Sequence, residues 1–167
     1  MLATYRPRAA QPLGLSREAH EALQSAPLTT GLSPAALDHL ADELQEQSFL
    51  PGHRVVTEGF SGQEFFIIVE GVAAVSVDAW RVARLGPGDF FGEIALLDEG
   101  LRFATITAET PLRCLVLAND ELERVLVDHP VLAVNLLRAM VRRFRDTIAK
   151  GRALEVGTPD DALVALG

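Results

Sequence analysis

Hydrophobic positions change their spacing twice along the chain, which divides it into helical, extended and again helical parts. Between residues 16 and 45 apolar residues recur every three or four positions, as from Leu37 to Leu44, which is the spacing of one helix face. Ser16 and Ser33-Pro34 supply capping residues. We therefore expect two short helices, the second running from Pro34 to about Gln45.

The next part consists of short apolar runs separated by glycine turns at intervals of about ten residues. The runs are Arg54 to Glu58, Phe65 to Val69, Val72 to Val77, Trp80 to Leu85, Thr105 to Ala108 and Leu112 to Leu117. This repetition predicts a mainly β fold with flanking helices, built as an antiparallel barrel or sandwich of the β-roll or jelly-roll kind.

Helical spacing returns near the C-terminus. Asn119 is placed to cap one helix, and Pro130 opens a second, which we expect to end at Gly151. The apolar residues of the last helix are three and four positions apart, namely Val134, Leu137, Val141, Phe144 and Ile148. This is a narrow coiled-coil seam, which either packs on the chain's own barrel or pairs with a second copy.

One run interrupts the strand pattern, from Phe90 to Ile106. Its order predicts a strand end, a tight turn at Gly92, one short helix over Glu93 to Leu97, a loop and a returning strand. Gly100 suits a left-handed cap at the end of that helix.

The start of such a short helix suits an anion, because its first N–H groups are unpaired and carry partial positive charge. Arg102 returns from the loop with a guanidinium that forks onto phosphate oxygens. Glu93 repels an anion but accepts hydrogen bonds from a neighbouring hydroxyl. One cation and one carboxylate suggest a ribose with a singly charged phosphodiester. The alternative is a structural turn in which Arg102 pairs with Asp98 or Glu99.

The run resembles the phosphate-binding cassette of the cyclic-nucleotide-binding domain family. The resemblance rests on Gly92-Glu93-Ile94-Ala95-Leu96-Leu97 followed by Arg102, Ala104 and Thr105, and it extends from about Leu32 to Lys150. It implies that Glu93 takes the ribose 2′-hydroxyl and Arg102 the cyclic phosphate. The expected ligand site comprises Gly92, Glu93, Ile94, Ala95, Arg102, Phe103, Ala104 and Thr147, with cAMP as the ligand.

Two positions depart from the family pattern. Leu101 stands where the family usually has proline, and Phe103 where it usually has alanine, serine or threonine. Phe103 either stacks on a purine or fills its pocket. It cannot supply the hydroxyl that reads guanine in the family, which makes cGMP less favoured. If it fills the pocket, the chain is a ligand-free relative that acts as a dimerisation or protein-interaction module.

The last helix resembles that of the family's bacterial regulators. Met140, Arg142-Arg143-Phe144 and Thr147 match the pattern Met-x-Arg-Arg-Leu-x-x-Thr. The resemblance implies that this helix closes over the ligand, with Thr147 reading the adenine edge and Arg143 as a second candidate. A solvated helix face is the alternative for both residues. Because the family's helix commonly dimerises, we expect a homodimer through residues 131–149.

Composition narrows the function classes. The 167 residues suit one domain, with 1–14 as a loose tail, 15–150 as the binding domain and 151–167 as a flexible tail too short for a helix-turn-helix. A net charge of −8 opposes direct nucleic-acid binding. With neither an apolar run of membrane-spanning length nor a signal core, we expect a cytoplasmic protein that binds no membrane.

Catalytic and metal chemistry find little support in the pattern. Cys114 lies in an apolar run and is expected to be a buried apolar residue rather than a reactive thiol. His20 and His39 have no second ligand at a useful spacing, which favours surface or cap roles. We therefore expect neither an enzyme nor a metal protein.

Overall fold

A computed structural model describes residues 14–94 and 100–156 of the chain. Two four-stranded antiparallel sheets pack against each other, with the strand orders β1-β8-β3-β6 and β2-β7-β4-β5. The first sheet consists of β1 (Gln45–Phe49), β8 (Leu112–Ala118), β3 (Glu64–Glu70) and β6 (Phe90–Phe91). The second consists of β2 (Arg54–Val56), β7 (Thr105–Ala108), β4 (Ala73–Val77) and β5 (Trp80–Leu85). The predicted antiparallel β-roll is thus confirmed.

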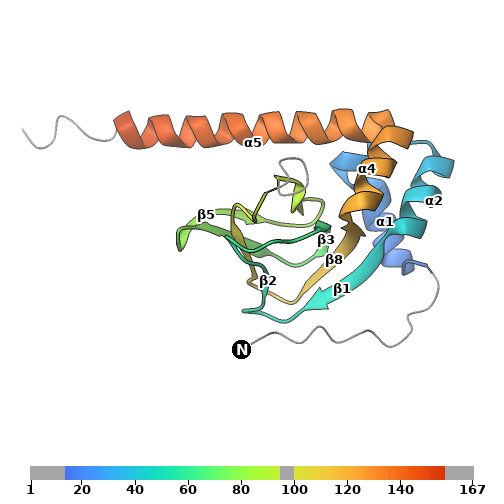
Figure 1. Cartoon of the computed structure of the whole chain (residues 1–167), viewed down its shortest axis with the longest axis horizontal. Coiled ribbons are helices and arrows are strands. Elements are labelled where there is room, and N and C mark those ends of the chain that lie inside the picture. The colour runs from blue at the N-terminus through green and yellow to red at the C-terminus, as the bar shows by residue number, and fades with distance from the viewer. Residues whose placement is uncertain (1–13, 95–99, 157–167) are drawn as a thin grey trace, which may run out of the picture.

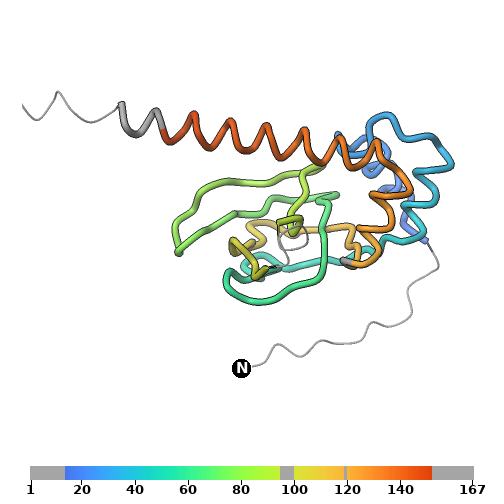
Figure 2. The backbone as a smooth tube through the Cα atoms, turned by 45° about the horizontal axis from the view of Figure 1, so that its top comes forward, coloured from blue at the N-terminus to red at the C-terminus, as the bar shows by residue number. Residues whose placement is uncertain are grey.

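Helices cover the first sheet (Figure 1). They are α1 (Arg17–Ser25), the 3-10 helix η1 (Pro27–Thr29), α2 (Pro34–Glu43), α4 (Asn119–Asp128) and α5 (Pro130–Val156). The hydroxyls of Ser16 and Ser33 accept the backbone N–H of Ala19 and Ala36, so both predicted caps are confirmed. Figure 2 shows α5 running along the molecule as far as the turn of the β4–β5 hairpin.

The central strand β3 is apolar on both faces because each face meets a different layer. Phe65 and Ile67 join the cluster formed with the helices, whereas Phe66 and Ile68 fill the space between the sheets. This explains the continuous FFII run. The same alternation in β6 directs Phe90 towards the helices and Phe91 between the sheets. Phe90 therefore lies under α5, two residues before Gly92.

Three expectations need correction. The segment from Gln45 to Phe49 forms β1 and pairs with β8, although the helical spacing predicted that the preceding helix runs to Gln45. Asn119 is the first residue of α4, and Ala118 is the cap. Gly151 does not end α5, which continues to Val156, so the first residues of the predicted 151–167 tail are helical. An exposed helix interior tolerates one glycine at a cost of about 1 kcal/mol.

Three further features bear on function. Cys114 is buried, as predicted, and burial raises the pKa of its thiol to about 12, so it is not a thiolate at neutral pH.

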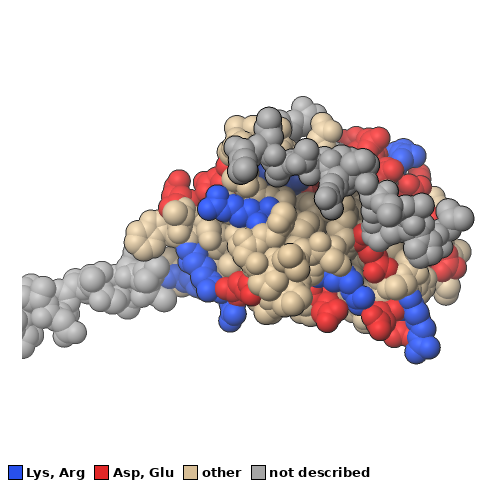
Figure 3. Space-filling view, turned by 90° about the horizontal axis from the view of Figure 1, so that it is seen from below, with Lys and Arg blue, Asp and Glu red and all other residues tan. Residues whose placement is uncertain are grey.

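Among the residues that the structure describes, no helix is long and apolar enough to cross a membrane. On the face turned away from α5, basic and acidic side chains are interspersed rather than gathered into a basic stripe (Figure 3).

Candidate functional site

The site begins at the Gly92 turn, directly after β6. Gly92 has a φ of +96°, and a Cβ there would lie 2.6 Å from the Glu64 carbonyl oxygen and 2.9 Å from Arg102 Nη1. Both the conformation and the close approach therefore require glycine. The helical turn begins with Glu93 and Ile94, as predicted, whereas Ala95 and the rest of the predicted helix to Leu97 lie outside the described residues.

The backbone of Arg102 is held by the loop between β2 and β3. Its N–H donates to the Phe60 carbonyl at 2.8 Å, and its carbonyl accepts from the Gly59 N–H at 2.9 Å. These two bonds fix the Cα of Arg102 opposite the Gly92 turn. No pattern in the sequence indicates this pairing, because the loop and the arginine are about forty residues apart.

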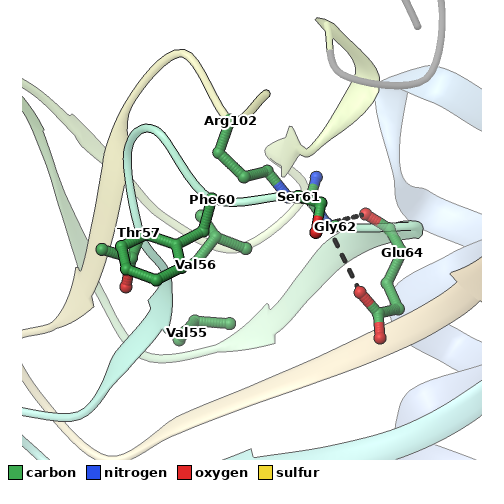
Figure 4. Close-up of a pocket in the computed structure, with 8 residues that line it drawn as sticks. All are labelled: Val55, Val56, Thr57, Phe60, Ser61, Gly62, Glu64 and Arg102. Atoms are coloured by element: carbon green, nitrogen blue, oxygen red, sulfur yellow. Dashed lines mark hydrogen bonds and ion pairs between the residues drawn. The ribbon is translucent and has the colours of Figure 1, made fainter. Parts of the chain in front are cut away.

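The Arg102 side chain reaches into the turn and is only 5% exposed. Nη1 donates to the Gly92 carbonyl at 3.2 Å. Nη2 donates to the Glu64 carbonyl at 2.9 Å and to the Glu64 carboxylate at 3.4 Å, and Figure 4 shows these two contacts. The predicted approach of Arg102 to Gly92 is present. Its ion-pair partner is Glu64, and the alternative partners Asp98 and Glu99 lie outside the described residues.

Gly62 makes room for this guanidinium. A Cβ on Gly62 would lie 2.2 Å from Arg102 Nε and 2.6 Å from Cζ, much closer than any real contact. Gly62 and Glu64 are thus site residues that the sequence reading missed. Gly62 lies in one of the glycine turns between the predicted strands, and only the approach of the arginine gives it a second role.

A hollow of about 210 Å³ opens beside Arg102. It is lined by Val55, Val56, Thr57, Phe60, Ser61, Gly62, Glu64 and Arg102. Burial lowers the pKa of the Arg102 guanidinium, whereas Glu64 and Glu93 act in the opposite direction. An arginine remains charged in any case, so the corner holds a desolvated positive charge.

Glu93 is also buried, at 5% exposed, and its partner comes from α5. Arg143 Nη1 donates to Glu93 Oε1 at 3.0 Å, and Nη2 donates to the Phe90 carbonyl at 2.5 Å. The Arg143 guanidinium also lies 4.2 Å from the centre of the Phe90 ring. Burial raises the pKa of Glu93, while Arg143 and, to a smaller extent, Arg102 lower it.

Arg143 has a partner that the helix pattern does not indicate. The resemblance makes it a second candidate for base recognition, and the structure joins it to the carboxylate expected to hold the ribose. The sequence signal was present in the Arg142-Arg143 pair, but only the path of α5 shows which of the two faces the sheet.

The remaining candidates stay on the surface. Phe103 is 62% exposed and is not among the residues that line the hollow, while Ile94 is exposed and Ala104 half-buried. Thr147 lies on the exposed part of α5, where its hydroxyl donates to the Arg143 carbonyl at 2.9 Å. Within the part of the chain that the structure describes, this is its one hydrogen bond. The structure thus brings Gly92, Glu93 and Arg102 together, and it leaves Phe103 and Thr147 outside their contacts.

Comparisons with known proteins agree with the fold. The family model described as "Cyclic nucleotide-binding domain" matches residues 46–129. A CRP-like cAMP-activated global transcriptional regulator of Mycobacterium tuberculosis is 33% identical over 132 residues, which cover 76% of this chain and 59% of that protein. The chain thus spans less than two thirds of the curated relatives it matches.

Two solved structures show both the likeness of the fold and the diversity of its use. The catabolite activator protein of Thermus thermophilus has a TM-score of 0.70 and 28% identity, covering 78% of this chain and 63% of that one. The regulatory subunit of a cAMP-independent protein kinase A from Trypanosoma brucei has a TM-score of 0.68 and 26% identity, covering 78% and 47%.

Proposed function

We propose that this chain, which belongs to the cyclic nucleotide-binding domain family, binds a cyclic mononucleotide and prefers cAMP. The family's domain is a sensor without catalytic activity. One observation carries the proposal: a desolvated guanidinium, Arg102, and a buried carboxylate, Glu93, flank the Gly92 turn. Burying two charges is costly, and a ligand with an anion next to hydroxyls recovers that cost.

Arg102 is the phosphate-binding group in this proposal. In the described structure its hydrogen bonds use Nη2 and one hydrogen of Nη1, which leaves Nε–H and the second Nη1 hydrogen as donors. The Glu64 carboxylate is more than half exposed and its contact is long, at 3.4 Å. Solvent therefore reaches the carboxylate end of this pair, and a phosphate oxygen can take its place on Arg102.

Glu93 accepts the ribose hydroxyl, and through Arg143 it connects the ligand to α5. A carboxylate has about four acceptor positions, so one oxygen bonds to Arg143 while a hydroxyl reaches the group as well. Any change in Glu93 is then felt by Arg143 and by the helix that carries it. This provides a direct path from the sugar to α5.

The base is recognised when α5 closes. Thr147 lies one turn beyond Arg143 on α5, and Phe103 is exposed and available for stacking. The ligand favours the closed arrangement only to the extent of the contacts made there and not in the open one. Closure of α5 is therefore the output of the sensor.

The alternative is a domain that kept the fold and lost the ligand. The name of the Trypanosoma brucei relative shows that this fold also serves a kinase described as cAMP-independent. Against this alternative, Phe103 leaves the hollow beside Arg102 open.

Calorimetric titration with cAMP, cGMP and a cyclic dinucleotide tests the proposal. We expect one saturable cAMP site per chain, weaker binding of cGMP, and an increase in unfolding free energy of about 2.7 kcal/mol when cAMP is at a hundred times its dissociation constant. The absence of both heat and thermal shift at millimolar cAMP would favour the ligand-free module.

A homodimer through α5 is the second part of the proposal. We define the α5 seam as Val134, Leu137, Val141, Phe144 and Ile148, all of which are exposed or nearly so. Five apolar side chains in one line form an unusual surface for a helix that already buries Leu132 and Leu136 on its other side. A second copy of the same seam is the simplest cover.

Charge decides the direction of that pairing. In heptads that place the seam at a and d, Arg138 and Arg145 both fall at e. An antiparallel pair brings e next to e, which juxtaposes arginines. A parallel pair brings e next to g, which is occupied by Ala133, Met140 and Thr147. The homodimer is therefore parallel, with both Thr147 side chains at the same level.

Light scattering after size exclusion checks this assembly. We expect a dimer of the parent and a monomer of the Leu137→Glu, Phe144→Glu double variant, with Trp80→Ser, another exposed apolar residue, as the control. A dimer that survives both changes would show that the seam is not the interface. We place the protein in the cytoplasm. Its proposed partners are a cyclic mononucleotide and a second copy of the chain.

A further inference from the structure

Two histidines that are 90 residues apart in sequence meet at the helical end of the molecule. His39 lies on α2, and His129 lies between α4 and α5, directly before Pro130. Nδ1 of His39 is 3.0 Å from Nε2 of His129, and their rings stand edge to face with centres 5.3 Å apart. His39 is exposed and His129 is half-buried, so solvent and ions reach the pair.

This spacing is that of a hydrogen bond between the rings, and it also fits two ligands on one metal ion. Metal–imidazole bonds are about 2.0–2.1 Å long, so nitrogens 3.0 Å apart subtend an angle of about 94° at the metal. Right-angle coordination suits Cu²⁺ and Ni²⁺, whereas tetrahedral Zn²⁺ needs a separation of about 3.3 Å. We propose that His39 and His129 form a binding site for a divalent transition-metal ion, with Ni²⁺ or Cu²⁺ as the best fit.

The surroundings favour a cation. Asp38, Asp42 and Glu43 lie on α2 together with His39, and α2 has no basic residue. Glu43 is one turn further along the face that carries His39. Asp128 precedes His129 directly. Together these carboxylates raise the local concentration of positive ions.

Water completes the coordination shell. Within residues 14–94 and 100–156 no group of three or more histidine, cysteine, aspartate or glutamate side chains is arranged to hold a metal. A site with two protein ligands is open, and its affinity depends on both imidazoles at once. Losing either histidine therefore removes most of the binding.

The proton balance of metal entry is simple. In the neutral pair one of the two facing nitrogens carries a hydrogen and donates it to the other. When the metal enters, the donor ring moves that proton to its other nitrogen, so both facing nitrogens present lone pairs. No net proton is released from a neutral pair.

The consequence of occupancy is a clamp on the base of α5. Figure 1 places α2 and α4 at the end of the molecule from which α5 starts. A metal that joins α2 to the residue preceding Pro130 stabilises the packing of α2 against the start of α5. It does not touch the Gly92 turn. The inference does not depend on nucleotide binding.

The test is calorimetric titration of untagged full chain with Ni²⁺ in a non-chelating buffer. We expect one Ni²⁺ per chain in the parent, and affinity lower by on the order of tenfold or more in His39→Gln and in His129→Gln. His53→Gln, at an exposed histidine between β1 and β2, keeps the parent's affinity. Glutamine preserves hydrogen bonding at these accessible positions, and circular dichroism confirms that each variant is folded.

Two further readouts make the result unambiguous. Paramagnetic Ni²⁺ broadens the imidazole signals of His39 and His129 before those of His20 and His53, and it raises the melting temperature of the parent but not of the two glutamine variants. Equal Ni²⁺ affinity in parent and His39→Gln, or no binding by the parent at millimolar Ni²⁺, overturns the proposal.

Discussion

The Gly92 corner and the outer half of α5 belong to the same proposed site, yet they are built in opposite ways. At the corner, Arg102 and Glu93 are each 5% exposed and fixed by backbone or ion-pair contacts. On the outer half of α5, Thr147 bonds only to its own helix within the described residues, and Phe144 is exposed. One region is already assembled, and the other has its apolar side chains in solvent.

The difference indicates a division of labour. A preformed corner binds sugar and phosphate with little reorganisation, which is where affinity comes from. The outer half of the helix, which gains contacts with the ligand only when α5 closes, supplies selectivity and the output. Arg143 is the link, because it belongs to α5 but contacts the corner.

Removing the corner's cation has the largest expected effect. Arg102→Ala loses the charge-assisted bonds to phosphate and should weaken cAMP binding by about 100-fold or more. Calorimetry measures this loss, and circular dichroism checks that the fold is retained. The control is Arg17→Ala, an exposed arginine on α1. Binding of the variant as tight as that of the parent would remove Arg102 from the site.

The second-largest effect is expected when the Arg102 guanidinium is displaced but not removed. In Gly62→Ala the new methyl group overlaps Arg102 Nε and Cζ, and the flexible side chain yields rather than the backbone. We expect roughly tenfold weaker cAMP binding with a nearly unchanged melting temperature. Gly86→Ala is the matched control, because a Cβ there meets nothing within 4 Å. Equal affinities in the two variants would contradict the role of Gly62.

Arg143→Met cuts the link between the two regions. Without Arg143 the pKa of the buried Glu93 rises further, because burial then acts with less opposition. A raised carboxyl pKa costs stability above the ordinary value of 4.5 and costs nothing well below it.

The variant should therefore be less stable than the parent by about 1–2 kcal/mol at pH 7, and the deficit should shrink below pH 4.5. Denaturant unfolding at pH 7 and at a pH below 4.5 measures the difference in unfolding free energy between variant and parent. Arg142→Met is the control. We also expect cAMP to bind a few-fold more weakly. A deficit that grows towards acid pH would mean that Glu93 is not the partner that matters.

The smallest effect is expected at Thr147. Thr147→Ala should change the ratio of cAMP to cGMP affinity by about threefold, because one exposed hydroxyl is lost at the end of α5. Thr147→Ser keeps the hydroxyl and should keep the ratio. If alanine and serine behave alike, Thr147 does not read the base.

The contrast between the Gly92 corner and the outer half of α5 also explains how much of the fold and of the site the sequence predicts. Alternating and helical spacings located nearly every strand and helix, and the corner residues Gly92, Glu93 and Arg102 follow one another within a single run. The sequence predicts the role of these three residues because they lie close together along the chain. β1 was missed because Gln45 to Phe49 is polar and becomes a strand only by pairing with β8.

The rest of the site depends on contacts between distant segments. Gly62 and Glu64 enter the site only because the loop after β2 binds the backbone of Arg102. Arg143 and His39 acquire partners 50 and 90 residues away. No spacing in the sequence predicts these two contacts, because they result from how β6, α2, α4 and α5 pack.

The side-chain Nε–H signal of Arg102 in a nitrogen-15 spectrum tests the central claim most directly. We predict that cAMP shifts this signal in a saturable way, with the same dissociation constant as calorimetry gives and one ligand per chain. A cAMP complex that forms while the Arg102 signal stays in place would contradict the account.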